Sequence, residues 1–168
     1  DFVAQHLGQL CDTAGEIAAR GEVSEGILAA FVEEAYFFKR PPKSLGRNDF
    51  ATLEHAVAEL PPADAVATLT AAAAAAVVKG AEHFPEPVSR ILVSGGGRKN
   101  KVLMRMLKAG LATPVAPVEA VGLNGDMLDA QAMGYLAVRV TRGLPTTSPE
   151  TTGVPAAIGG GVISKGPA

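Results

Sequence analysis

Apolar residues recur with a helical period of three to four positions through most of the chain. This pattern predicts helices over 1–10, 24–40, 51–60, 63–84, 98–111 and 124–143. The 63–84 helix has the strongest support, because its alanines combine high helix propensity with small side chains that allow close packing. Ser24 is the expected N-cap of the 24–40 helix, and the prolines at 41 and 42 end it.

Two shorter segments have the composition of strands. The runs SRILVSGGG (89–97) and PVAPV (114–118) are apolar, and each is followed by a helical pattern. The order strand, helix, strand, helix over 88–143 predicts a small, mostly parallel sheet with crossover helices. We therefore expect a helix-rich α/β fold, with a helical and loop insertion at 21–62. The tail beyond 144 is expected to be an ordered surface wrap or a last short strand.

Composition narrows the classes of protein. The chain has 168 residues, enough for one domain or one lobe, and a formal net charge of −2, so no basic excess indicates nucleic acid or an anionic membrane. Cys11 is the single cysteine, which excludes an internal disulfide, and the three histidines lack metal-ligand spacing. The uncharged run 65–78 is shorter than a membrane span.

Three consecutive glycines, Gly95, Gly96 and Gly97, follow the first predicted strand and precede a helix. A turn of this kind directs backbone N–H groups out of the carboxyl edge of a sheet, next to the positive end of the helix. A single glycine would satisfy a tight turn that needs positive φ. Three glycines favour a nucleotide that lies against the main chain.

A dinucleotide-binding turn is the alternative. Gly95 and Gly97 fit the first two positions of G-x-G-x-x-G, but Asn100 stands at the third. Glu119, after the second strand, lies where an acidic ribose ligand is expected. The long helical region that precedes the turn argues against this alternative.

Two further groups of polar residues are candidates for a site. Asp126 and Asp129 share one face at the start of the last predicted helix, where they would either cap the helix or face a substrate. Lys43, Ser44 and Arg47 occupy a proline-bounded loop. That loop would either bind an anion or be solvated, with Ser44 as a helix cap.

The segment LVSGGGRKNKVLMRML resembles the adenosine-contact motif of the sugar kinase, heat-shock protein and actin ATPase superfamily. Three other segments, PPKSLGRNDF, GLNGDMLDAQAMGYLA and GLPTTSPETTG, make the chain similar to the C-terminal lobe of the anhydro-N-acetylmuramic acid kinase family. The resemblance implies a single ribonuclease H-like lobe, over 1–168, of the actin/hexokinase-type ATPase fold. A non-catalytic actin-like lobe is a further alternative.

The resemblance also implies a function. The family's enzymes are cytoplasmic, use ATP with Mg²⁺, and act on an amino sugar in peptidoglycan recycling, often as homodimers. They open the 1,6-anhydro ring of anhydro-N-acetylmuramic acid with water and phosphorylate its 6-oxygen. By this resemblance Gly95, Gly96, Gly97 and Asn100 contact adenosine. Asp126, Asp129, Lys43 and Ser44 lie near the sugar by the same resemblance.

The chain departs from the family pattern in two ways. The family's phosphate loop and its Asp-Thr-Gly-Pro-x-Asn segment, which would hold most of the Mg²⁺ contacts and the general base, are expected before Asp1. The 168 residues alone are therefore expected to lack turnover. The second departure is Asp129, which stands where the family commonly has glutamate and is one methylene shorter.

Overall fold

The computed structural model describes residues 2–46 and 48–164, so Arg47 of the predicted anion loop lies outside the described residues. The chain forms two compact units, 1–125 and 126–168. The first unit contains α1 (Phe2–Leu7), η1 (Thr13–Gly15), η2 (Ala18–Arg20), α2 (Glu25–Val32), α3 (Ala35–Phe38), α4 (Ala51–Val57), α5 (Pro62–Ala81), β1 (Ile91–Val93), η3 (Gly96–Lys99), α6 (Lys101–Gly110), β2 (Val115–Pro117) and η4 (Val118–Val121). The second contains α7 (Leu128–Thr141) and α8 (Pro149–Thr152).

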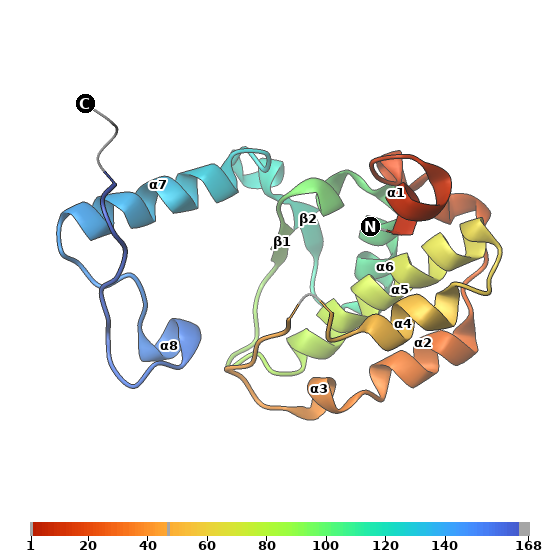
Figure 1. Cartoon of the computed structure of the whole chain (residues 1–168), viewed down its shortest axis with the longest axis horizontal. Helices are drawn as coiled ribbons and strands as arrows, with labels where there is room; N and C mark the ends of the chain where they lie inside the picture. Colours follow the sequence, from red (N-terminus) through yellow and green to blue (C-terminus); the bar gives the residue numbers. More distant parts are fainter. Residues whose placement is uncertain (1, 47, 165–168) are drawn as a thin grey trace. The chain divides into compact units, whose positions relative to one another are not determined.

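Helix α5 is the central element of the first unit (Figure 1). It begins with Pro62 at its first turn, where the missing N–H costs no hydrogen bond. Its alanines give close contacts mainly with helices α2 and α6 and with the η2 turn. By length and composition α5 could cross a membrane, but it contributes seven buried residues to the first unit, as a core helix does.

The packing around α5 forms three apolar clusters. Val57 and Thr68 are completely buried. The hydroxyl of Thr68 accepts a hydrogen bond of 3.0 Å from the backbone N–H of Ser24, so the buried polar atom is satisfied. Ser24 occupies the predicted N-cap position of α2. Its side chain, however, makes no capping hydrogen bond, contrary to prediction.

The helix predicted over 24–40 is two helices. Glu34 adopts an extended conformation between α2 and α3 and breaks the helix. In one continuous helix, Phe31 and Phe37 would point about 120° apart around the axis. The break instead brings their rings to 5.0 Å, edge to face, and buries both side chains in one cluster. Aromatic packing of this pair thus outweighs local helix propensity at Glu34.

The sheet is parallel, as predicted, and consists of two short strands. Ile91 pairs with Val115 and Val93 with Pro117. Helix α6 connects the strands and buries Met104 and Leu107 against them in the second cluster. Both strands therefore end at the same edge of the sheet, with the glycine turn after β1 and the η4 turn after β2.

The second unit begins with a turn and continues as α7. The helix starts at Leu128, later than the predicted start at Asn124 or Asp126, because residues 125–127 form turns. It ends at Thr141, and Gly143, just past its last turn, adopts the left-handed conformation typical of a helix end. The tail contains α8 and an isolated antiparallel bridge between Thr147 and Ile158.

Candidate functional site

The glycine turn begins directly beyond β1. Gly95 has φ of 68° and ψ of −171°, a combination that essentially only glycine adopts. This residue is the one that the strand-to-helix turn requires for its own geometry. The turn then continues through η3 to the N-terminus of α6.

Gly96 and Gly97 have no such backbone requirement. Neither has positive φ. A Cβ on Gly97 would lie 3.2 Å from Leu103 Cδ2, whereas a Cβ on Gly96 would meet no atom within 4 Å. Gly96 is exposed, so its glycine character has no explanation inside the first unit. It leaves the backbone open to close approach from outside.

Asn100 is the N-cap of α6. Its Oδ1 atom accepts hydrogen bonds of 3.0 Å from both Val102 N and Leu103 N, satisfying two of the helix's first N–H groups. The cap uses the side-chain oxygen, so the amide nitrogen Nδ2 is the group that can donate to a ligand. The predicted adenosine contact therefore also has a structural role.

An ion pair joins the two loops at this edge of the sheet. Arg98 Nε donates to Glu119 Oε1 at 2.8 Å, and Arg98 Nη1 donates to the Gly95 carbonyl at 2.7 Å. Glu119 Oε1 also accepts from Gly125 N at 3.1 Å. Glu119 Oε1 is thus bonded to both Arg98 and Gly125, so this carboxylate joins the two loops.

The same contacts influence the titration of Glu119. A hydrogen bond from its own backbone lowers the pKa of Glu119 most, and partial desolvation opposes this effect. Arg98 and the Gly125 N–H lower the pKa further. The carboxylate is therefore ionised at neutral pH and keeps its pairing with Arg98.

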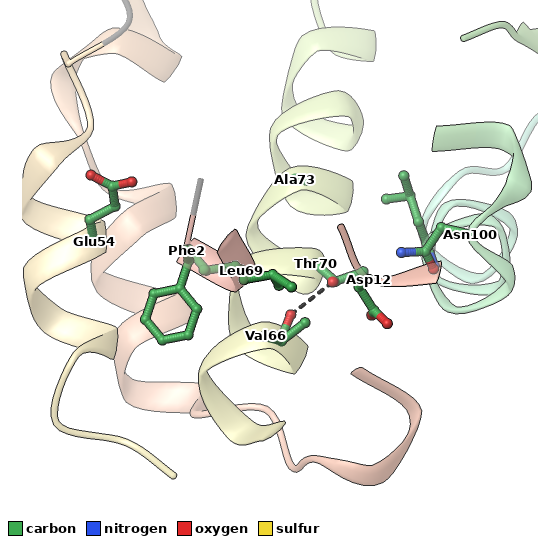
Figure 2. Close-up of a pocket in the computed structure, with 10 residues that line it drawn as sticks. Phe2, Asp12, Glu54, Val66, Leu69, Thr70, Ala73 and Asn100 are labelled. Carbon is green, nitrogen blue, oxygen red and sulfur yellow. Dashed lines mark hydrogen bonds between the residues drawn. The ribbon is translucent and has the colours of Figure 1, made fainter. Parts of the chain in front are cut away.

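A cleft of about 380 Å³ lies beside Asn100 in the first unit (Figure 2). Figure 2 shows Asp12 and Asn100 at one end of this cleft and Glu54 at the other, with Phe2 and Leu69 between them. Asp12 accepts hydrogen bonds from two backbone N–H groups, those of residues 17 and 18, at 2.8 and 3.0 Å. The carboxylate therefore holds the loop that covers the α6 N-terminus.

Three residues of this region were not identified as site residues from the sequence: Asp12, Gly15 and Arg98. The spacing of Asp12 and Gly15 in DTAG is a capping signal, an acidic side chain followed by a glycine turn with φ of 80°. No local sequence pattern indicates a role for Arg98, because its partner Glu119 lies 21 residues away along the chain. Only the pairing of β1 with β2 brings these two residues together.

The predicted anion loop has a structural contact in the first unit. Lys43 Nζ donates to the carbonyls of Tyr36 and Phe37 at 3.1 and 3.3 Å, and it lies 4.6 Å from the centre of the Tyr36 ring. These bonds satisfy carbonyls at the end of α3. Ser44 is exposed and does not cap a helix, since the N-cap position of α4 is Phe50.

Asp126 and Asp129 both belong to the second unit and are exposed. The N-cap position of α7 is Met127, whose side chain makes no capping hydrogen bond. Asp129 lies in the first turn, where a negative charge is favoured by the helix dipole. Neither carboxylate occupies the N-cap position itself. Among the described residues, no group of three or more His, Cys, Asp or Glu side chains could hold a metal ion.

An open glycine turn beside a helix N-terminus, at the carboxyl edge of parallel strands, is typical of α/β proteins that bind nucleotides and phosphates. The family model of anhydro-N-acetylmuramic acid kinase matches residues 1–165, and the chain belongs to this family. Its helix-rich α/β architecture with a small parallel sheet agrees with the actin/hexokinase-like kinase fold expected from the sequence.

Individual relatives are similar over nearly the whole chain. The anhydro-N-acetylmuramic acid kinase of Ruegeria sp. (strain TM1040) is 57% identical over 164 residues, 98% of this chain and 44% of the relative. That of Cereibacter sphaeroides is 59% identical over 165 residues, with the same coverage. That of Paramagnetospirillum magneticum is 48% identical over 162 residues, 46% of its length. The chain therefore spans less than half the length of these curated relatives.

Proposed function

We propose that this chain supplies the adenosine-binding part of an ATP-dependent sugar kinase. The complete enzyme adds water to C1 of 1,6-anhydro-N-acetylmuramic acid as the bond from C1 to O6 breaks. The freed O6 takes the γ-phosphoryl group of ATP, and ADP leaves. Family membership supports a kinase over a dinucleotide-binding domain or a non-catalytic lobe.

The observation that carries this proposal is the open face of Gly96. The first unit places no atom within 4 Å of a Cβ at this position, and the backbone has no positive φ there. A glycine without an internal reason, beside the positive N-terminus of α6, fits a backbone that a nucleotide approaches. Gly95, Gly97 and Asn100 complete the contact, Asn100 through its Nδ2 atom.

Phosphoryl transfer depends on positioning and on charge stabilisation by several loops at once. ATP brings Mg²⁺ with it, and the described residues contain no cluster of ligands for this ion. We assign the metal mainly to the rest of the enzyme, together with the general base. The 168 residues are then a C-terminal lobe that binds ATP weakly and does not turn over. The enzyme acts in the cytoplasm on a small amino sugar.

We place Asp126 and Asp129 near the sugar, since both are exposed and α7 uses neither as its N-cap. The loop containing Lys43 and Ser44 is the second sugar-proximal candidate. Because two of the ammonium's three donors serve carbonyls of α3, the role of Lys43 would be to fix this loop, with one donor left for the substrate.

The test uses a kinase of the relatives' length that contains this segment. Gly96→Ala and Gly96→Val should raise the KM for ATP progressively, because each added methyl group occupies the space of the nucleotide. The melting temperature should stay within about 2 °C, since the first unit leaves this space empty. Gly80→Ala is the matched control: Gly80 also has nothing within 4 Å of its Cβ position but lies in α5. An unchanged KM for ATP in Gly96→Val would refute the nucleotide contact, and a wild type that never forms ADP with the anhydro sugar would refute the kinase.

A further inference from the structure

Arg98 and Glu119 connect the loops that follow the two strands. Arg98 lies in η3, beyond β1, and Glu119 lies in η4, beyond β2. The Arg98 side chain is only 6% exposed, whereas that of Glu119 is 46% exposed. A buried guanidinium is costly unless its charge is paired and its N–H groups are bonded. Its position therefore depends on the hydrogen bonds that it makes.

Those bonds form a closed ring. Arg98 binds the Gly95 carbonyl and the Glu119 carboxylate, and Glu119 accepts from the N–H of Gly125. The ring closes because Gly95 N donates to the Gly125 carbonyl at 3.2 Å. Each of the four residues thus bonds to two others of the ring. The two loops cannot move apart without breaking a charge-assisted bond.

The ring also explains why residue 125 is glycine. A Cβ on Gly125 would lie 2.3 Å from Arg98 Nε and 2.6 Å from its Cζ. Gly125 is buried and has no positive φ, so its backbone conformation does not require glycine. Glycine is required at this position because the Arg98 side chain lies too close for a Cβ atom.

The bond from Arg98 to Gly95 has a consequence for the neighbouring residue. The carbonyl of Gly95 and the N–H of Gly96 belong to one planar, trans peptide group. Holding the oxygen therefore sets the direction of the Gly96 N–H, at the residue whose face is open. Without this bond, two adjacent glycines would leave that peptide plane free to rotate.

We infer that Arg98, held by Glu119 and Gly125, is a positioning residue that orients the Gly95–Gly96 peptide for the adenine nucleotide. The inference rests on the proposed kinase function and adds to it residues that the adenosine motif does not contain. Arg98 acts through the backbone of the turn. Its loss should therefore weaken ATP binding and leave binding of the sugar unchanged.

The experiment measures kcat and the KM values for ATP and for the anhydro sugar in the longer kinase that contains this segment. Arg98→Met keeps an aliphatic side chain and removes the N–H groups that bind the Gly95 carbonyl and the Glu119 carboxylate. We expect it to raise the KM for ATP roughly tenfold, the size of one lost charge-assisted hydrogen bond. Arg98→Lys should recover part of this loss. Gly125→Ala displaces the Arg98 side chain without changing either charge and should reproduce Arg98→Met. Glu82→Gln, which breaks the exposed Lys79–Glu82 pair, is the control expected to have no effect.

The outcomes separate the possibilities. If Arg98 acts through the ring, the double variant Arg98→Met/Gly125→Ala has the same KM for ATP as either single variant. A fall in melting temperature with wild-type KM for ATP in Gly125→Ala and Arg98→Lys would show a purely structural ion pair and overturn the inference. If Arg98→Met does not fold, the KM values for ATP of Gly125→Ala and Arg98→Lys still distinguish a positioning role from a purely structural one. A wild-type enzyme that does not use ATP would instead contradict the proposed function.

Discussion

A Cβ atom on Gly15 would lie 2.3 Å from the Oδ1 atom of Asn100. The same Oδ1 atom caps α6 through the N–H groups of residues 102 and 103. Gly15 also has φ of 80°, and its N–H donates to the carbonyl of Asp12. The 12–15 turn is therefore packed directly onto the helix cap beside the proposed nucleotide contact.

Gly15→Ala should destabilise the protein by about 2–5 kcal/mol. The left-handed conformation costs a residue with a Cβ about 1–2 kcal/mol, and forcing an atom against Asn100 adds about 1–3 kcal/mol of overpacking. Urea unfolding monitored by circular dichroism gives the difference. Gly80→Ala, inside α5 with open space at its Cβ, should be neutral or stabilising by up to about 1 kcal/mol. Equal effects of the two substitutions would contradict the close packing at Gly15.

Asn100 variants separate the helix cap from the ligand contact. Asn100→Ala removes both and should cost about 1 kcal/mol of stability, as the loss of an N-cap does. Asn100→Asp retains the acceptor and adds a charge that the α6 N-terminus favours, so stability should be preserved. It also loses the Nδ2 donor and places a negative charge near the nucleotide. We therefore expect Asn100→Asp to raise the KM for ATP with an unchanged melting temperature, and a wild-type KM would exclude the Nδ2 contact.

Local patterns in the sequence were sufficient for most of the fold. Helix α5 and the parallel pair β1 and β2 follow from alanine content and from the order of elements, and both are confirmed. The exceptions have tertiary causes. The break at Glu34 serves a contact between Phe31 and Phe37, and no helical period contains that information. Turn geometry likewise delays the start of α7 to Leu128.

The candidate site was predictable only in part. The three glycines and Asn100 were visible because they are contiguous and have a known physical use at a strand end. Arg98, Glu119 and Gly125 depend on one another across two loops, so no local pattern shows their pairing. Asp126 and Asp129 lie in the second unit, and their role near the sugar stays a prediction.

Glu119 should make stability depend on pH in the acidic range, through the hydrogen bond to its own backbone and then through its contacts with Arg98 and Gly125. The pKa of Glu119 in the folded protein is lowered from 4.5, so the folded state favours the ionised carboxylate. The resulting stabilisation is fully present above about pH 4.5 and is lost as the pH falls through the lower folded value. The protein should therefore lose this contribution on acidification and keep it at neutral pH.

A comparison with Glu119→Gln measures this contribution. The difference in melting temperature between wild type and variant should be constant from about pH 6 to 7.5 and should shrink below about pH 4.5. Glu82→Gln is the control, because it also removes one acidic group, from the ion pair of Lys79 and Glu82 at the C-terminal end of α5. A wild-type advantage that grows on acidification would have the wrong sign and would contradict the lowered pKa.

The final prediction concerns Asp129, in the first turn of α7. In the proposed enzyme its carboxylate accepts a hydrogen bond from the sugar or from the attacking water. Asp129→Asn keeps the shape and removes the charge. The favourable interaction with the helix dipole is about 0.3–1 kcal/mol, so the protein should remain folded. Loss of a contact made in the transition state costs about 2.7–4 kcal/mol, and kcat should fall roughly 100- to 1000-fold.

Two companion variants make the Asp129 test specific. Asp129→Glu introduces the residue that the family resemblance leads us to expect at this position and should retain turnover, because the charge is kept and the reach increases by one methylene. Glu150→Gln removes an acidic residue from the first turn of α8 in the same unit and should leave kcat unchanged. Steady-state ADP release and melting temperatures are measured for all three variants. If Asp129→Asn lowers only the melting temperature, by a few degrees, and keeps the wild-type rate, the carboxylate serves the helix dipole and not the substrate.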